Sequence, residues 1–204
     1  SDVYKRQHIG SRFFLKGIYN RFIQWLKGEF GGEREREIAS KTKYILIAGD
    51  IIDGVGIYPM QELELEEVHI RDQYRMAFQL LDQVPDHIEI ILIPGNHDAT
   101  RRALPQPPII REYAEQFYNS DRFYMMGNPV QLELHNVNIY SFHGRSLDDC
   151  VSTMPGIRQN NIAEAMKILL RIRHIAPIYG LKERIVPQKE DTLCLLYTSP
   201  SPRD

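Results

Sequence analysis

Residues 44–54 read YILIAGDIIDG, and residues 88–98 read IEIILIPGNHD. Each segment is an apolar run rich in isoleucine that ends in a glycine and a group of polar residues. This pattern predicts two buried strands of an α/β protein, each followed by a loop at its carboxyl end. The helical spacing of residues 68–84, which stops at Pro85, predicts a strand–helix–strand unit with parallel strands.

The polar residues of the two loops are of types that bind divalent metal ions. Asp50 and Asn96 offer hard oxygen atoms, and a carboxylate such as Asp50 can bridge two ions about 3.5 to 4 Å apart. His97 can donate a proton to a leaving oxygen, and Asp98 can fix the orientation of that imidazole ring. Asp53 is expected to make hydrogen bonds to the backbone of its own loop and, at most, to support the metal ligands without binding the ions itself. We therefore predict a two-metal phosphoesterase.

Each motif also has a purely structural interpretation. The first loop alone is as consistent with an Asx turn as with a metal site, and residues 95–98 could form a histidine–aspartate turn cap. A third candidate, His143, follows a predicted strand, but by itself it would more often be a buried, hydrogen-bonded histidine. Because all three candidates lie at predicted strand ends, we favour the metal site.

The rest of the chain has clear local preferences. Apolar residues at helical spacing predict further helices at residues 12–30, 109–117 and 160–172. The glycines and charges of residues 31–37 predict a solvated link into the first strand. Alternating apolar residues predict a hairpin of residues 130–134 and 137–142.

Composition sets broad limits on the class of protein. With 204 residues and 43% hydrophobic content, the chain can build one sizeable core, so one domain is expected. The net charge of -2 gives no global sign of a nucleic-acid binder. No apolar run approaches the roughly 20 residues of a membrane span. Because Cys150 is the only cysteine outside the terminal segments, a reducing interior is expected, and we predict a cytoplasmic location.

The two ends of the chain are related through their coding DNA. Residues 2–7, DVYKRQ, can be encoded by a DNA whose reverse complement, read in another frame, encodes CLLYTS, the sequence of residues 194–199. The DNA resembles a transposon adapter used in sequencing. We therefore expect residues 1–7 and 194–204 to be translated adapter, and residues 8–193 to be a domain fragment of a longer protein.

Several segments together resemble the small subunits of archaeal family-D DNA polymerases. They are residues 8–11, 49–59, 95–98 with 105–107, 142–149 and 173–180. The resemblance covers essentially all of residues 8–193 and is more specific than the calcineurin-like metallophosphoesterase signature that it contains. It implies an α/β fold of two stacked mixed β-sheets flanked by helices, truncated here at both ends.

The resemblance also implies a function and a set of site residues. It implies a proofreading 3′ to 5′ exonuclease that hydrolyses phosphodiesters at single-stranded DNA 3′ ends beside a large polymerase subunit. Two divalent ions would be bound by His8, Asp50, Asn96 and His143, while His97 and Asp98 act at the scissile phosphate. Manganese is the family-typical ion, although these ligand types do not choose among manganese, magnesium, iron and zinc.

The chain departs from the family pattern at several ligand positions. Arg6 stands where the first motif needs an aspartate, and residues 8–193 contain no Gly-His-x-His motif. We therefore expect the 204-residue chain to bind metals weakly and to cut DNA poorly or not at all, whereas the intact parent should be active.

Three arginines are candidate contacts for DNA phosphates, and two other functions are alternatives to the exonuclease. Arg101, Arg102 and Arg145 follow candidate ligands and could pair with DNA phosphates, although surface arginines are commoner than phosphate-binding ones. A metallophosphatase for phosphomonoesters or phosphoproteins would use the same metal chemistry. A non-catalytic polymerase accessory subunit is a third interpretation, but it would have no obvious use for the candidate ligands together.

Overall fold

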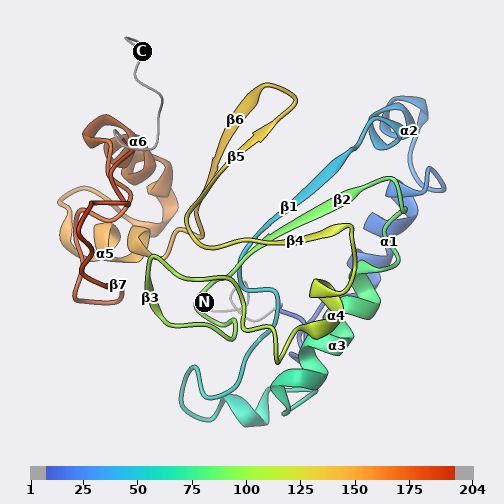
Figure 1. Cartoon of the computed structure of the whole chain (residues 1–204), viewed down its shortest axis with the longest axis horizontal. Coiled ribbons are helices and arrows are strands. Elements are labelled where there is room, and N and C mark those ends of the chain that lie inside the picture. The colour runs from blue at the N-terminus through green and yellow to red at the C-terminus, as the bar shows by residue number, and fades with distance from the viewer. Residues whose placement is uncertain (1–7, 196–204) are drawn as a thin grey trace. The chain divides into compact units, whose positions relative to one another are not determined.

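A computed structural model describes residues 8–195, and Figure 1 shows the helices and strands that they form. The chain divides into two compact units. Within the described residues, unit 1 contains residues 8–100 and 108–126, and unit 2 contains residues 101–107 and 127–195. The mixture of helices and sheets confirms the predicted α/β class.

Two predictions about chain organisation are not decided by this structure. The single domain expected over residues 8–193 stays a prediction, and so does the adapter origin of residues 1–7 and 194–204. Residues 1–7 and 196–204 lie outside the described residues.

Unit 1 is built on a parallel sheet of three strands. Its order is β1 (Tyr44–Ala48), β2 (Glu89–Ile93), β4 (Phe123–Met125). The two predicted strands are confirmed, and β1 pairs with β2 in parallel from Tyr44 opposite Glu89 to Ala48 opposite Ile93. The loops that follow these strands therefore leave the sheet at the same edge.

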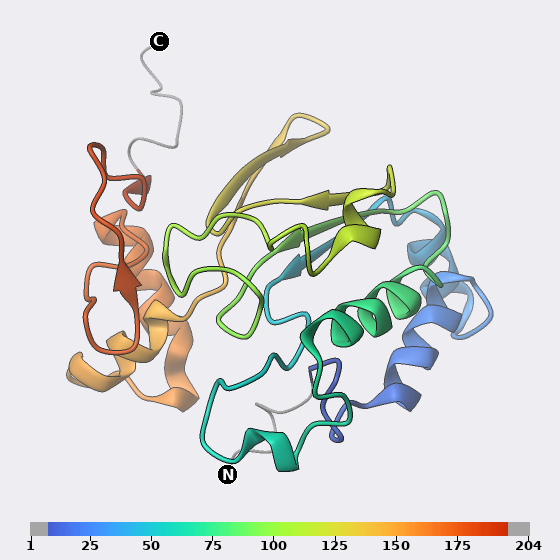
Figure 2. The same cartoon turned by 60° about the horizontal axis from the view of Figure 1, so that its bottom comes forward.

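The helices of unit 1 are of very different lengths. They are α1 (Lys16–Leu26), α2 (Glu33–Ser40), α3 (Ile70–Leu81) and α4 (Glu115–Tyr118). Figure 2 shows α1 and α3 on one side of the sheet. Tyr74, Ala77 and Leu81 of α3 are buried in the same cluster as Ile90 and Leu92 of β2, so α3 and the sheet share one apolar core.

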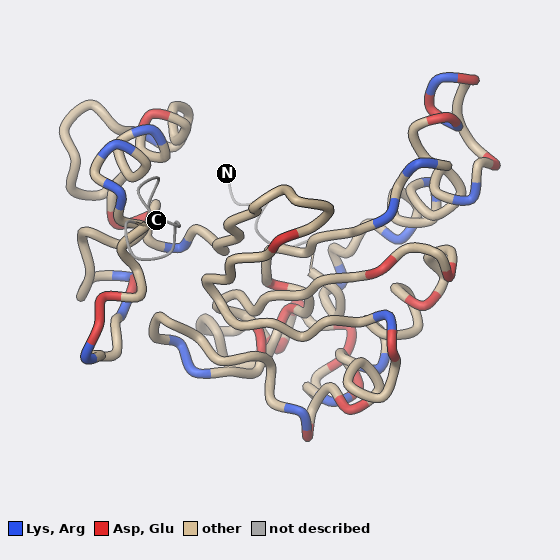
Figure 3. The backbone as a smooth tube through the Cα atoms, turned by 45° about the horizontal axis from the view of Figure 1, so that its top comes forward, with Lys and Arg blue, Asp and Glu red and all other residues tan. Residues whose placement is uncertain are grey.

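The solvent exposure predicted for residues 31–37 is confirmed, but the irregular link predicted there is wrong, because α2 occupies Glu33–Ser40. Glutamate and arginine are good helix formers, and glutamates in the first turn complement the helix dipole. Lys41 also pairs with Glu37 four residues earlier. Figure 3 shows the two signs of charge alternating along this helix.

Two predicted helices are shorter than the periodicity suggests. The helix expected at residues 12–30 begins only at Lys16, because the amide of Arg12 donates to the carbonyl of Glu64 instead. The helix expected at residues 109–117 is reduced to α4, because the amide of Ile110 donates to the carbonyl of Ala99. Long-range backbone hydrogen bonds replace helical ones in both cases.

Unit 2 contains the predicted hairpin and a helical segment. The hairpin strands are β5 (Val130–Leu134) and β6 (Val137–Ser141), and the helices are α5 (Ser146–Thr153) and α6 (Ile162–Ile172). The short strands β3 (Ala103–Leu104) and β7 (Arg184–Ile185) pair in parallel. The hairpin and the helix expected at residues 160–172 are confirmed.

The expected pair of mixed sheets is not found among residues 8–195. The sheets of this region are a parallel set, β1-β2-β4, a parallel pair, β3-β7, and an antiparallel pair, β5-β6. A mixed sheet would require a strand of the hairpin to pair with a parallel strand, but within the described chain β5 and β6 pair with each other. None of the helices in residues 8–195 has both the length and the apolar character of a membrane span.

Candidate metal centre

The centre forms where three chain segments meet at the carboxyl edge of the unit 1 sheet. Ile9 lies beside the first loop, since its amide donates to the carbonyl of Ile51 over 3.3 Å and its carbonyl accepts from the amide of Asp53 over 2.8 Å. His8 is thereby carried to the loops that follow β1 and β2. Local periodicity could not predict this approach, because the segment from residue 8 to residue 15 forms no long helix or strand.

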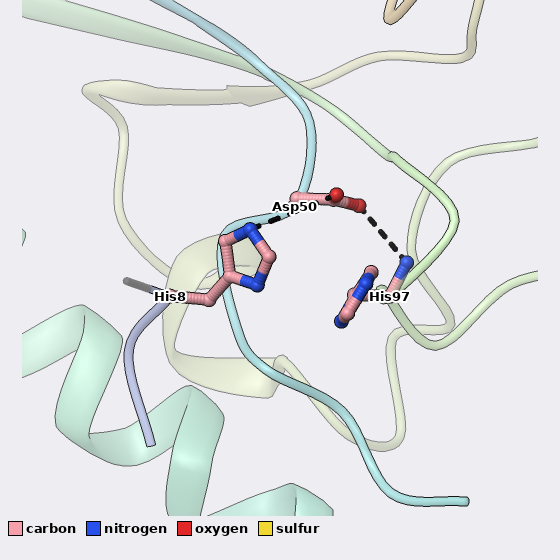
Figure 4. A group of neighbouring side chains, drawn as sticks. All are labelled: His8, Asp50 and His97. Atoms are coloured by element: carbon pink, nitrogen blue, oxygen red, sulfur yellow. Dashed lines mark hydrogen bonds and ion pairs between the residues drawn. The ribbon is translucent and has the colours of Figure 1, made fainter. Parts of the chain in front are cut away.

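Three half-buried side chains come together there. Donor atoms of His8, Asp50 and His97 all lie within 4.8 Å of one another, and Figure 4 shows them converging. The Nε2 atom of His8 lies 3.8 Å from Oδ2 of Asp50. The amide of His97 donates to Oδ1 of Asp50 over 2.9 Å, and the two imidazole rings are 4.5 Å apart between centroids.

Asp53 orients both imidazole rings from the interior. Its buried carboxylate accepts from Nδ1 of His8 over 3.1 Å, and its backbone carbonyl accepts from Nδ1 of His97 over 2.7 Å. Because a carbonyl oxygen can only accept, Nδ1 of His97 must carry a proton. The Nε2 atom of each neutral ring then carries a lone pair and no proton. Histidine binds metal ions through a nitrogen in this state.

The first loop has a backbone that depends on glycine. Asp50 has a φ of 54°, a left-handed conformation that is strained for a residue with a side chain. Gly54 has a φ of 72°, and a Cβ atom there would lie 2.4 Å from the carbonyl oxygen of His97. The two loops can therefore approach this closely only because residue 54 has no side chain.

Asp98 has contacts that differ from those expected. Its carboxylate does not orient His97 but accepts from the amides of Gly95 (2.9 Å) and Ile51 (3.3 Å) and from the hydroxyl of Tyr74 (3.1 Å). The side chain points into the protein and is only 5% exposed. Asp98 therefore joins the two loops, while its expected role at the scissile phosphate stays a prediction.

Burial and charge shift the pKa values of these groups in different directions. Burial lowers the pKa of His8, but the hydrogen bond to Asp53 and the negative charges of Asp50, Asp53 and Asp98 reverse the effect, and its pKa is raised. Burial dominates at His97, whose pKa is lowered despite the carboxylate of Asp50. Burial raises the pKa of Asp98 to about 6, against the opposing effect of its amide donors.

The donor set fits a divalent cation. A carboxylate and two imidazole nitrogens, half-buried and within reach of one another, suit manganese, iron or zinc better than calcium. The hydrogen bond from His8 to the Asp53 carboxylate is the outer support that metal-binding histidines usually have.

The other predicted site residues lie around this group or in unit 2. Asn96 is half-buried and adjacent to His97. His143 belongs to unit 2, where it is half-buried and its amide donates to Oδ1 of Asn128 over 3.1 Å. Its expected role as a ligand stays a prediction.

The predicted phosphate-binding arginines also belong to unit 2. Arg101 and Arg102 are exposed, and Arg101 donates from Nε to the carbonyl of Pro105 over 3.0 Å. Arg145 is half-buried, and its positive charge acts on the carboxyl of Glu183. Phosphate binding by the three arginines stays a prediction.

Sequence reasoning missed three residues that hold the site loops. Gln61 donates to the carbonyl of Asp53 over 2.8 Å, while Gln73 and Tyr74 of α3 bond Gly54 and Asp98. Each of the three side chains is 0% or 1% exposed. The one available signal was a polar Gln73 beside the apolar stripe of the predicted helix.

Comparison with known proteins shows the family to which this chain belongs. The sequence profile that describes the B-subunit of DNA polymerase alpha/epsilon matches residues 36–202. This chain belongs to the DNA polymerase alpha/epsilon B-subunit family. Together with the archaeal relatives described next, this match confirms the resemblance to archaeal polymerase small subunits. The matched range overlaps residues 194–204, whose adapter origin stays a prediction.

Curated relatives of this B-subunit family member include three archaeal proteins. The DNA polymerase II small subunit of Archaeoglobus fulgidus is 42% identical over 188 residues, which is 92% of this chain and 38% of the relative. That of Methanocaldococcus jannaschii is 43% identical, over 92% of this chain and 32% of the relative. That of Methanothermobacter thermautotrophicus is 41% identical, over 96% of this chain and 40% of the relative. The chain thus spans well under half the length of these relatives.

Proposed function

We propose that this chain is part of the small subunit of an archaeal replicative DNA polymerase and carries its proofreading 3′ to 5′ exonuclease centre. The proposal includes a calcineurin-like phosphoesterase fold and a large polymerase subunit as partner. It also includes two divalent ions, for which manganese is the preferred metal. Single-stranded DNA 3′ ends are the proposed substrate.

One observation carries this proposal. His8, Asp50 and His97 offer donor atoms within 4.8 Å of one another, and Asp53 fixes the histidine rings with their Nε2 atoms unprotonated in the neutral state. A purely structural subunit would gain nothing from half-buried histidines and a strained aspartate in this arrangement. The family membership of the chain adds the polymerase context.

The role proposed for each histidine follows from which of its ring nitrogens carries a proton. Bound divalent ions would polarise the scissile phosphate and activate a water molecule. His8 and Asp50 would hold an ion, and Asp53 would keep His8 in the correct tautomer. Because Nδ1 of His97 already donates to a carbonyl, its Nε2 cannot hold an ion and carry a proton at the same time. The proposal gives this nitrogen the proton for the departing 3′ oxygen, so His97 would not bind the ion during that step.

Metal binding by the 204-residue chain is the first test. We expect Mn²⁺ titration, followed by the electron paramagnetic resonance of free Mn²⁺, to detect weak binding that is lost in His8→Gln. Replacing the exposed His87 in the same way should leave the binding unchanged. Equal binding by the wild-type chain and His8→Gln would reject the proposed centre.

Nuclease activity is the second test. The full-length Archaeoglobus fulgidus relative and this chain should be compared on 5′-labelled single-stranded DNA with Mn²⁺. We expect the relative to shorten the strand from its 3′ end and this chain to be much slower. Faster hydrolysis of p-nitrophenyl phosphate than of DNA would favour a phosphatase, and no hydrolysis by the relative would favour a non-catalytic subunit.

A further inference from the structure

We propose that Gln73 and Tyr74, adjacent residues of α3, are positioning residues that set the spacing of the metal ligands by holding all three site segments. This inference rests on the proposed metal centre. The polar atoms of both side chains bond backbone groups or Asp98. Their effect would be exerted through the loops that carry those ligands.

Tyr74 bonds the loop that follows β2 and, through Asp98, supports the loop that follows β1. Its hydroxyl donates to Oδ1 of Asp98 over 3.1 Å and accepts from the amide of Ala99 over 2.8 Å. The other oxygen of Asp98 accepts from the amides of Gly95 and Ile51. The amide of Ile51 follows Asp50 directly, so the buried hydroxyl holds the His97 loop itself and supports the Asp50 loop through the carboxylate of Asp98.

Gln73 reaches the remaining segment and the end of the first loop. Its Oε1 accepts from the amide of Gly54 over 2.9 Å, and its Nε2 donates to the carbonyls of Gly54 (3.1 Å) and Glu67 (2.7 Å). A Cβ atom on Gly10 would lie 2.7 Å from the Cδ and Cγ atoms of Gln73. The side chain therefore packs directly against the backbone two residues after His8.

The two side chains use one helix to locate three loop segments. Both are near the start of α3, whose inner face is buried in the unit 1 core. Adjacent helical residues point about 100° apart, which lets Tyr74 and Gln73 bond different loops from neighbouring backbone positions. Ligands held by buried hydrogen bonds to a helix lose little freedom when an ion binds, and removing such support typically weakens metal affinity about 10- to 100-fold.

Tyr74→Phe tests the first half of the proposal, because it removes the hydroxyl and retains the ring. Tyr19→Phe is the matched control, since the Tyr19 hydroxyl donates to the carbonyl of Leu80 over 2.7 Å and bonds no site loop. In the metal-free 204-residue chain, we expect Tyr74→Phe to accelerate amide exchange at Ile51, Gly95 and Ala99, measured by NMR. Mn²⁺ affinity should fall about tenfold in Tyr74→Phe and stay unchanged in Tyr19→Phe.

Gln73→Leu tests the second half and covers the case in which Tyr74→Phe does not fold. It should accelerate exchange at Gly54 while leaving Gly95 and Ala99 protected, the reverse of the pattern in Tyr74→Phe. A general loss of stability would loosen the same amides in both variants. Such a common pattern would overturn the positioning role.

Further outcomes separate this inference from the proposed function. If the loop amides loosen as expected but Mn²⁺ affinity equals that of the wild-type chain, Gln73 and Tyr74 do not position ligands. If the wild-type chain binds no Mn²⁺ at all, the metal centre is rejected. The exchange patterns then still decide whether these two residues hold the loops.

Discussion

Units 1 and 2 have interiors of different kinds. In unit 1 one continuous cluster of buried side chains links β2 to α1, α3 and α4. In unit 2 the buried apolar residues form two small clusters, one around Leu104 and Ile175 and one around Cys150 and Ala165. Helix α6 also exposes apolar side chains, with Met166 51% and Leu170 65% exposed.

Buried polar groups are mostly hydrogen-bonded in both units, as Asp149 and Asn128 are in unit 2, and the units differ at one buried hydroxyl. The polar residues around the candidate centre of unit 1, including Asp53, Gln73 and Asp98, are hydrogen-bonded on several sides. In unit 2 the hydroxyl of Tyr140 is buried without a hydrogen-bond partner among the described residues. The polar site of unit 1 lies beside a continuous core, where burial makes each hydrogen bond strong and each missing one unfavourable.

The largest expected effect tests the difference between the continuous core of unit 1 and the exposed apolar face of α6 in unit 2. Ile90→Ala in β2 should lower the free energy of unfolding by about 4 kcal/mol, because it leaves a cavity in the continuous core. Leu170→Ala on the exposed face of α6 should change it by no more than about 0.5 kcal/mol. Urea denaturation of both variants measures the values. Similar losses would contradict the contrast between the units.

A smaller effect tests how tightly the site loops approach each other. Gly54→Ala should cost about 3 kcal/mol, since a left-handed φ is strained and the new Cβ would meet the carbonyl of His97. Gly56→Ala is the matched control, because Gly56 also has a positive φ but no atom within 4 Å of the added Cβ, so about 1 kcal/mol is expected. Thermal unfolding should separate the two variants, and equal losses would show that the loops can move apart.

The next effect concerns the negative charge of Asp50 at the candidate metal centre of unit 1. Asp50→Asn retains an oxygen acceptor for the amide of His97 but removes the negative charge. We expect Mn²⁺ affinity to fall at least tenfold, which is about 1.4 kcal/mol, with little change in stability. Asp86→Asn, at a fully exposed carboxylate, is the control for a change in net charge. If calorimetric titration gave the same Mn²⁺ affinity for both variants, the result would contradict the proposed metal site.

The smallest effect is a difference between the two histidines of the metal-free chain. His8 should titrate above its ordinary pKa of 6.5 and His97 below its ordinary pKa of 6.5, measured from the ring protons by NMR. The stability contributed by His8 should then be fully present below pH 6.5 and lost as the pH rises through its raised pKa. For His97, whose pKa is lowered, stability should instead fall as the pH drops through 6.5. The reverse order of titration would show that the bond to Asp53 and the nearby carboxylates do not outweigh burial at His8.

Local sequence patterns were sufficient where one short segment settles its own structure. The apolar runs of β1 and β2, the spacing of α3 and α6 and the alternation of β5 and β6 all correspond to observed elements. They failed where tertiary bonds compete with local preference, as at Arg12 and Ile110, whose amides bond distant carbonyls. Pattern also missed α2, where charge was read as a sign of solvation although it also favours a helix.

By itself the sequence determined which groups are available for chemistry: the loops that end in Asp50 and His97 and, through its motifs, the polymerase subunit family. Only the tertiary structure decided how these groups are used. It turned Asp98 inward to join two loops, made Asp53 the residue that orients both histidines, and gave Gln73 and Tyr74 their contacts with those loops. The physical reason is that a side chain's direction and partners depend on segments distant in sequence, which local periodicity does not contain.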